Sequence, residues 1–186
     1  MTRVNVTKFL GLMAAALCLV VGTAQAQDGD DLSAKTVKLI TGFALTTIPS
    51  EIKRPDGTVM KIDKSDKESI TVPLEDARRV IKVARLSAHA QMCELPQLQA
   101  QNYLTMMRQE RAKDKWTEEQ LLFINRLHLF TVMWLSGNVK FVDKGDGSKE
   151  PEIISDPDES EYECSDKDRK QVRAQIENYL KAAKKS

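Results

Sequence analysis

The pair of neighbouring residues best suited to chemistry in this sequence is His89 and Cys93. Residues four apart lie on the same face of a helix, so this spacing can present two ligands to a metal ion or place a base beside a thiol. No other cysteine or histidine cluster stands near them in the sequence. The pair is therefore a weak signal for either site, and the simpler interpretation of His89 is a half-buried histidine near a helix end.

The chemistry open to Cys93 depends on the cellular compartment, and the first 26 residues predict export. Arg3 and Lys8 precede an uncharged apolar run over residues 9–21, and Ala24-Gln25-Ala26 is a small-x-small cleavage site. This order is typical of a secretory signal peptide, and the run is shorter than the ~20 residues that a membrane-spanning helix needs. We expect residues 1–26 to be removed and the remaining chain to be periplasmic or secreted.

Export changes how the three cysteines are interpreted. Cys18 leaves with the signal peptide, so that Cys93 and Cys164 remain. An even pair in an oxidising compartment predicts one disulfide. A bond between them would close a loop of 72 residues, counted from Cys93 to Cys164, and the chain-entropy model gives such a loop a stabilisation of about 4 kcal/mol. The alternative is a pair of thiols that serve a metal or catalysis.

A second histidine stands in the most hydrophobic part of the chain. His128 lies between Leu127 and Leu129, and a buried imidazole usually stays neutral and hydrogen-bonded. We expect its partner on the preceding helix, where the polar residues are Asn102, Tyr103 and Glu110. The alternative is a pocket against the central helix, whose weak ligand-binding candidates are His89, Tyr103, Met106, His128 and Trp134.

Residues 143–164 form an acidic segment. They contain nine acidic residues against Lys144 and Lys149, and such a composition favours a solvated surface loop. Asp156 and Asp158 begin a spacing that resembles a calcium loop, but Glu161 stands where the sharp turn needs glycine. Weak binding of divalent cations by this loop stays an open alternative, and we assign no metal site.

The composition and the absence of several catalytic motifs reduce the number of function classes that fit the sequence. The sequence contains no Gly-x-Ser-x-Gly, no phosphate-binding glycine loop, no His-Glu-x-x-His and no Cys-x-x-Cys. The formal net charge is +1, which gives no basic excess for nucleic acid. We assign no catalytic residue and no cofactor, and we expect no membrane span after removal of the signal peptide.

The spacing of apolar residues predicts mainly helices. Amphipathic or apolar stretches, with Ser33, Pro73, Pro96, Thr117 and Ser165 as start signals, predict helices over 33–46, 73–94, 96–113, 117–135 and 165–183. Two alternating β-branched stretches predict a β-hairpin over about 58–72. The expected fold is mostly α, a compact bundle of about five helices with one small β-hairpin, forming a single domain over 27–186.

These observations favour a non-catalytic envelope protein of a bacterium. We expect it to act by surface recognition of another envelope protein or a cell-wall component, through the hairpin (59–72) and the acidic loop (143–163), because loops and strand edges tend to carry recognition. A carrier of a small ligand or metal, with its pocket against the central helix, is the alternative. An uncharacterised hydrolase is a third possibility.

Overall fold

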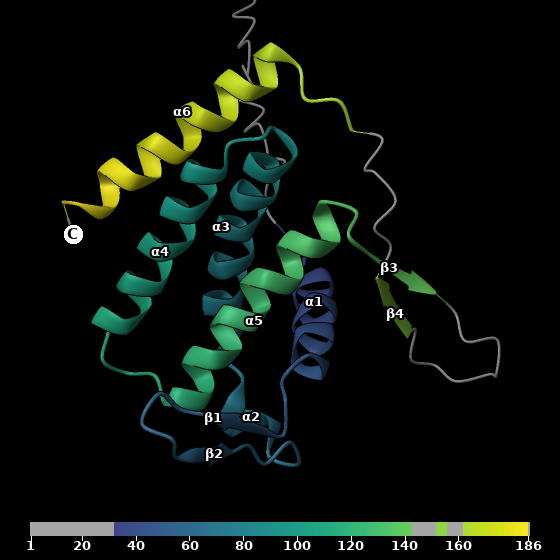
Figure 1. The fold of residues 1–186 in the computed structure, drawn as a ribbon, viewed down its shortest axis with the longest axis vertical. Coiled ribbons are helices and arrows are strands. Elements are labelled where there is room, and N and C mark those ends of the chain that lie inside the picture. The colour runs from purple at the N-terminus through teal and green to yellow at the C-terminus, as the bar shows by residue number, and fades with distance from the viewer. Residues whose placement is uncertain (1–31, 143–151, 156–161, 186) are drawn as a thin grey trace, which may run out of the picture. The chain divides into compact units, whose positions relative to one another are not determined.

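The computed structural model describes residues 32–142, 152–155 and 162–185 (Figure 1). The predicted signal peptide and most of the acidic segment therefore lie outside the described residues.

Six helices account for most of the described chain, which confirms the prediction of a mainly helical bundle. They are α1 (Ala34–Thr46), α2 (Lys67–Ile70), α3 (Leu74–Met92), α4 (Pro96–Ala112), α5 (Glu118–Leu135) and α6 (Asp166–Ala183). Helix α3 is the centre of the packing, because it contacts α1, α4, α5 and α6 (Figure 1).

The starts of three helices follow the expected capping signals. Ser33 accepts a hydrogen bond from the backbone N–H of Thr36, and Ser165 accepts one from that of Asp168. Thr117 and Gln120 form a complete capping box at the start of α5. Each cap satisfies backbone donors that the first helical turn leaves unpaired, so these local signals alone place the helix starts.

The hairpin lies upstream of the position that the sequence predicts. Strand β1 (Glu51–Lys53) pairs antiparallel with β2 (Val59–Lys61), across a turn in which Gly57 has a φ of +87°. The expected second strand is instead the one-turn helix α2, whose N-cap Asp66 accepts from the backbone N–H of Ser69. The prediction of one small hairpin is confirmed and β2 lies in the first predicted stretch, but the bounds 58–72 were wrong. The Asp56-Gly57 turn pairs β2 with the preceding strand, and the Asp66 cap makes the second predicted stretch helical.

A second two-stranded ribbon interrupts the acidic segment. Strand β3 (Val139–Val142) pairs antiparallel with β4 (Glu152–Ser155). The extended conformation of residues 139–142 agrees with the sequence, whereas a strand at 152–155 departs from the expectation of an uninterrupted loop over 143–164.

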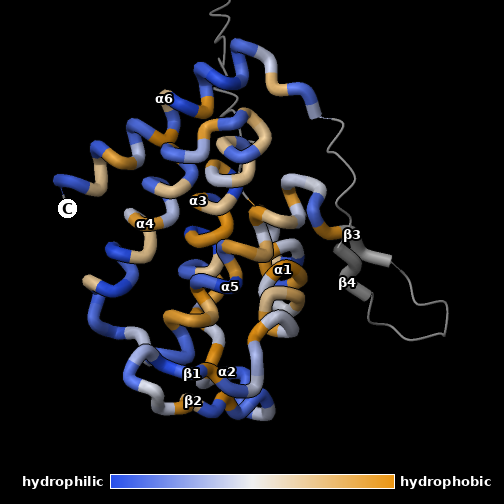
Figure 2. The backbone as a smooth tube through the Cα atoms, in the orientation of Figure 1, coloured by the Kyte–Doolittle hydropathy of each residue, from blue (hydrophilic) through white to orange (hydrophobic). Residues whose placement is uncertain are grey.

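The main hydrophobic core fills the space between α1, α3, α4 and α5 and extends to the hairpin. Its largest fully buried side chains include Phe123, Ile81, Ile124 and Leu127. A smaller cluster lies where α6 meets the corner between α3 and α4, and contains Ala90, Cys93, Leu95, Val172 and Ile176. The helices carry hydrophobic and hydrophilic residues in alternation along the tube in Figure 2, as amphipathic helices of a bundle do.

None of the helices in the described residues combines the length and the apolar character that crossing a bilayer requires.

Helices α3 and α5 end in the same backbone motif but with different residues at its left-handed position. After α5 this position is Gly137, with a φ of +81°. After α3 it is Glu94, with a φ of +56°, followed by a 2.8 Å hydrogen bond from the Leu95 N–H to the Ala90 carbonyl. A side chain in this conformation is unfavourable by roughly 1–2 kcal/mol.

Replacing Glu94 by glycine is therefore expected to stabilise the fold. We expect Glu94→Gly to raise the free energy of unfolding by about 0.5–1 kcal/mol, after the greater entropy of glycine in the unfolded chain is subtracted. Urea unfolding followed by circular dichroism measures this change. The control Glu94→Ala keeps the left-handed strain and should change stability little; a loss of stability in Glu94→Gly would contradict the account.

Candidate functional site

Cys93 and Cys164 form a disulfide with their Cα atoms 5.1 Å apart. The bond joins the C-cap of α3 to the segment before α6, and Cys93 is fully buried in the small cluster that α6 covers. It therefore holds the start of α6 against the corner between α3 and α4.

This bond leaves the His89–Cys93 pair without a thiol. A sulfur in a disulfide is neither a nucleophile nor a thiolate ligand. His89 lies in the last turn of α3. The two sequence candidates His89 and Cys93 consequently do not form a site for metal or thiol chemistry.

His128 belongs to a buried polar network that joins three helices. Its Nε2 atom lies 3.0 Å from the Ser87 hydroxyl of α3. The Asn102 side-chain amide of α4 donates to that hydroxyl and to the Val83 carbonyl, each at 2.9 Å. The partner of His128 is thus Ser87, so the expectation that Asn102, Tyr103 or Glu110 hydrogen-bonds it was wrong.

The orientation of the Asn102 amide can be assigned. The Val83 carbonyl only accepts, so it fixes the Asn102 amide with its NH₂ group toward α3. The Ser87 oxygen accepts from Asn102. Because it keeps a second lone pair and its proton, the same hydroxyl either donates to His128 Nε2 or accepts from it, according to the tautomer of the ring. The Asn102 side-chain oxygen, Oδ1, is buried and has no hydrogen-bond partner within the described chain.

Burial explains the state of His128. Desolvation lowers its pKa from 6.5 to about 4, because a charged imidazole is poorly solvated inside the bundle. A serine hydroxyl beside a histidine nitrogen is the geometry of an activated nucleophile. Ser87 is fully buried and His128 is only 5% exposed, so this arrangement holds helices together rather than offering a hydroxyl to a substrate.

The other candidates around the central helix pack as parts of the core. The ring centroids of Tyr103 and His128 are 5.1 Å apart, and the Tyr103 hydroxyl donates to Asn125 at 3.0 Å. Met106 is buried in the main cluster, and Trp134 packs against that cluster. The structure thus places Tyr103 next to His128. Tyr103, Met106, His128 and Trp134 all lie at the main core.

One helical turn farther along α3, a second polar layer bridges the same three helices. Gln99 of α4 donates to Gln91 of α3 at 2.9 Å. Gln91 reaches the Ser136 hydroxyl at the end of α5, 3.4 Å away, and Asn138 donates to the same hydroxyl at 3.1 Å. Both polar layers fix the register of α4 and α5 on α3.

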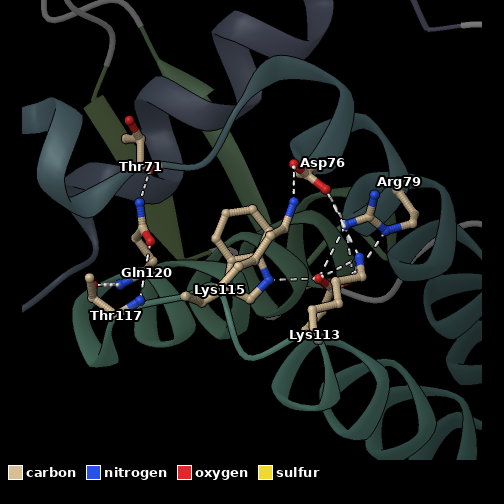
Figure 3. Close-up of polar contacts among 9 residues, drawn as sticks. Thr71, Asp76, Arg79, Lys113, Lys115, Thr117 and Gln120 are labelled. Atoms are coloured by element: carbon tan, nitrogen blue, oxygen red, sulfur yellow. Dashed lines mark hydrogen bonds and ion pairs between the residues drawn. The ribbon is translucent and has the colours of Figure 1, made fainter.

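A cluster of charged residues at the opposite end of α3 was not foreseen from the sequence. Glu110 is 2% exposed and accepts two hydrogen bonds from Arg79, at 3.0 and 3.1 Å. Lys113 and the Trp116 indole also donate to it, at 2.9 and 3.0 Å. The donors come from α3, from the end of α4 and from the segment before α5; Figure 3 labels Arg79 and Lys113 among them.

Asp76 completes this cluster on the side of α3. It accepts from Arg79 at 2.6 Å and from Lys115 at 3.2 Å, while Lys115 also lies 4.1 Å from the centre of the Trp116 ring. In the same view, Gln120 of the capping box donates to the Thr71 carbonyl at the end of α2 (Figure 3). The ends of α2, α3, α4 and α5 are therefore tied together by polar contacts.

The carboxylates of the cluster stay ionised. Burial raises the pKa of Glu110, but hydrogen bonds from Arg79, Lys113 and Trp116 outweigh this effect and hold the pKa below its usual value. Burial also raises the pKa of Asp76, whereas the hydrogen bonds from Arg79 and Lys115 lower it. The net effect is a pKa below the usual value. A carboxylate that keeps its charge is poorly suited to act as a general acid near neutral pH, so we assign the cluster a structural role.

Removal of the Glu110 charge is expected to destabilise the protein. We expect Glu110→Gln to lower the free energy of unfolding by about 2 kcal/mol, since Arg79 and Lys113 lose their carboxylate but remain partly solvated. The matched control is Glu75→Gln, which removes an exposed carboxylate bound to Arg78 and should cost less than about 0.5 kcal/mol. Equal losses in the two variants would contradict a special role for Glu110.

Only the local ion pairs of this cluster could be predicted from the sequence. The spacings of Asp76 to Arg79 and of Glu110 to Lys113 are visible as ion pairs three residues apart on a helix. The meeting of Arg79 with Glu110 depends on how α3 packs on α4, which no local pattern reports.

No arrangement in the described residues brings three or more His, Cys, Asp or Glu side chains together in a way that could hold a metal ion. The calcium alternative concerns residues of the acidic segment that lie outside the described ranges.

No model of a known protein family matches the sequence, and no curated protein or solved structure shows significant similarity to it.

Proposed function

We propose that this protein is an exported, non-catalytic helical domain that recognises another envelope protein or a cell-wall component through its surface. Two observations support this: residues 1–26 are predicted to be an export signal, and the reactive side chains described above lie inside the fold. Cys93 and Cys164 form a disulfide, and His128 and Ser87 belong to a buried hydrogen-bond network.

The hairpin β1–β2 is the described surface that supports recognition best. Its solvent face carries the two cross-strand pairs Glu51–Lys61 and Lys53–Val59, all four of them exposed. Val59 is 51% exposed, although the neighbouring Met60 on the same strand is buried in the core. An apolar side chain held outward by an anchored strand is the single observation that carries this choice.

The anchoring makes the hairpin a defined surface rather than a loose loop. Ile52 packs against the main core from the opposite face of the ribbon. Arg54 forms an ion pair with Glu118 in the first turn of α5. A partner that binds the hairpin therefore meets a surface already held in position, which lowers the entropy cost of binding.

Site-specific crosslinking in the living cell tests the proposal. A photoreactive residue at Val59 or Lys61 is expected to give a discrete light-dependent adduct in the envelope fraction. The same residue at Lys38, an exposed position on α1, should give none. Val59→Asp in an unlabelled competitor should no longer suppress the adduct.

Two further measurements separate the possible partners. Co-sedimentation with purified peptidoglycan distinguishes a wall component from a protein, and a probe within 143–163 tests the other predicted contact region. Failure of every hairpin and acidic-segment probe to form an adduct, with the protein correctly exported, would contradict surface recognition.

A further inference from the structure

A group of exposed basic side chains lies at the C-terminal ends of α4 and α6. The Tyr179 hydroxyl of α6 donates to the Gln109 side chain of α4 at 2.6 Å, so the last turns of the two helices are held together. We call the exposed cations of these two helix ends the basic face; they are Arg108, Arg111, Lys181, Lys184 and Lys185.

These five cations differ from the other basic residues nearby. Lys113 and Lys115 bind Glu110 and Asp76. Within the described parts of the chain, no side chain of the basic face makes a hydrogen bond or ion pair. The acidic residues of residues 104–115 and 177–185 are Glu110, Asp114 and Glu177, against seven basic ones, and Glu110 is already neutralised by its own partners.

An exposed leucine extends the basic face along α4. Leu104 is 55% exposed, and Arg108 and Arg111 follow it at intervals of four and three residues, on the same side of the helix. The outer turns of α4 and α6 can be followed in Figure 2, where α6 lies across α4. Long cationic side chains on the same side of a helix as an apolar one match the interface of a bilayer, with charges at the phosphates and the leucine among the headgroups.

We propose that the basic face binds the phosphate headgroups of an anionic lipid bilayer, with Leu104 entering the headgroup layer. Positive side chains near an anionic bilayer each strengthen binding by about fivefold, and salt screens this attraction. The inference goes beyond the proposed function, because a lipid surface is neither a protein nor a wall polymer. It also stands independently, since binding to vesicles requires no partner at the hairpin.

A vesicle-sedimentation experiment with the oxidised protein, started at residue 27, tests this. We expect binding to vesicles of equal parts phosphatidylglycerol and phosphatidylcholine, none to phosphatidylcholine alone, and loss of binding in high salt. Arg108→Gln with Arg111→Gln should lower the partition constant about 25-fold. Leu104→Ser should lower it severalfold and leave the salt dependence unchanged.

The matched control separates a defined face from general charge. Lys35→Gln with Lys38→Gln removes two exposed lysines from α1, which packs on α3 and α5 and not on α4 or α6, and should leave binding unchanged. Circular dichroism checks that each variant is folded. An equal loss in the control, binding to uncharged vesicles, or binding only to an acidic protein surface would overturn the proposal.

Discussion

Removal of the disulfide is expected to lower the free energy of unfolding by about 4 kcal/mol. The bond links Cys93 and Cys164, 71 positions apart, so the unfolded chain regains the freedom of a long loop when it is absent. The variant for this test is Cys93→Ala with Cys164→Ala, unfolded in urea. A loss of this size is a large share of the stability of a small domain.

Reductant supplies the internal control. Reduction should destabilise the wild-type protein by a similar amount and leave the double variant unchanged. Hydrogen exchange should show α6 losing protection before α3 and α5, because the bond holds the start of α6 and the small cluster that it covers. Equal stability of the wild-type protein with and without reductant would contradict a structural disulfide.

Acid is expected to destabilise the protein through His128, by about 3 kcal/mol between pH 6.5 and 4. The pKa of His128 is lowered to about 4 in the folded state, whereas the unfolded chain titrates near 6.5. Above pH 6.5 both states are neutral and the group has no effect. As the pH falls, the unfolded state takes up the proton first, and stability declines until the folded state is protonated near pH 4.

His128→Gln should remove this decline, because its side-chain amide can still hydrogen-bond Ser87 but cannot be protonated in this range. The control is His89→Gln, which removes the other of the two histidines and keeps His128, so the decline should persist. Urea unfolding at a series of pH values measures both. An NMR titration in which the His128 ring changes with a midpoint near 6.5 would contradict the account.

The carboxylates of the charged cluster add a separate acid effect. Because the pKa of Glu110 is lowered in the folded state, its contribution is present above the unfolded value near 4.5 and is lost as the pH falls below it. The loss of stability caused by His128 therefore begins at a higher pH than the loss caused by Glu110. The histidine variants measure the His128 effect separately.

Local signals were enough to predict most helices. Ser33, Thr117 and Ser165 cap the helices that the sequence assigns to them, and Pro96 starts α4. These features depend on contacts between residues close in the chain, and helix starts are set largely by such contacts.

The features that could not be predicted from the sequence depend mostly on contacts between residues far apart in the chain. Ile70 and Val72 are buried, as their alternation indicates, but the Asp66 cap places Ile70 in a helical turn instead of a strand. The partner of His128 is Ser87, 41 residues away on another helix. Arg79 and Glu110 are 31 residues apart. In these two pairs the partner is decided by helix packing, which leaves no periodic mark in the sequence.

We propose that the protein is exported and that Cys93 and Cys164, the two cysteines left after signal removal, stabilise the fold as a disulfide. Intact-mass spectrometry of the protein from the envelope fraction, alkylated before and after reduction, tests it most directly. We predict a chain that begins at Gln27, with no alkyl group before reduction and two after it. A chain that retains residues 1–26, or one that takes up two labels before reduction, would contradict the account.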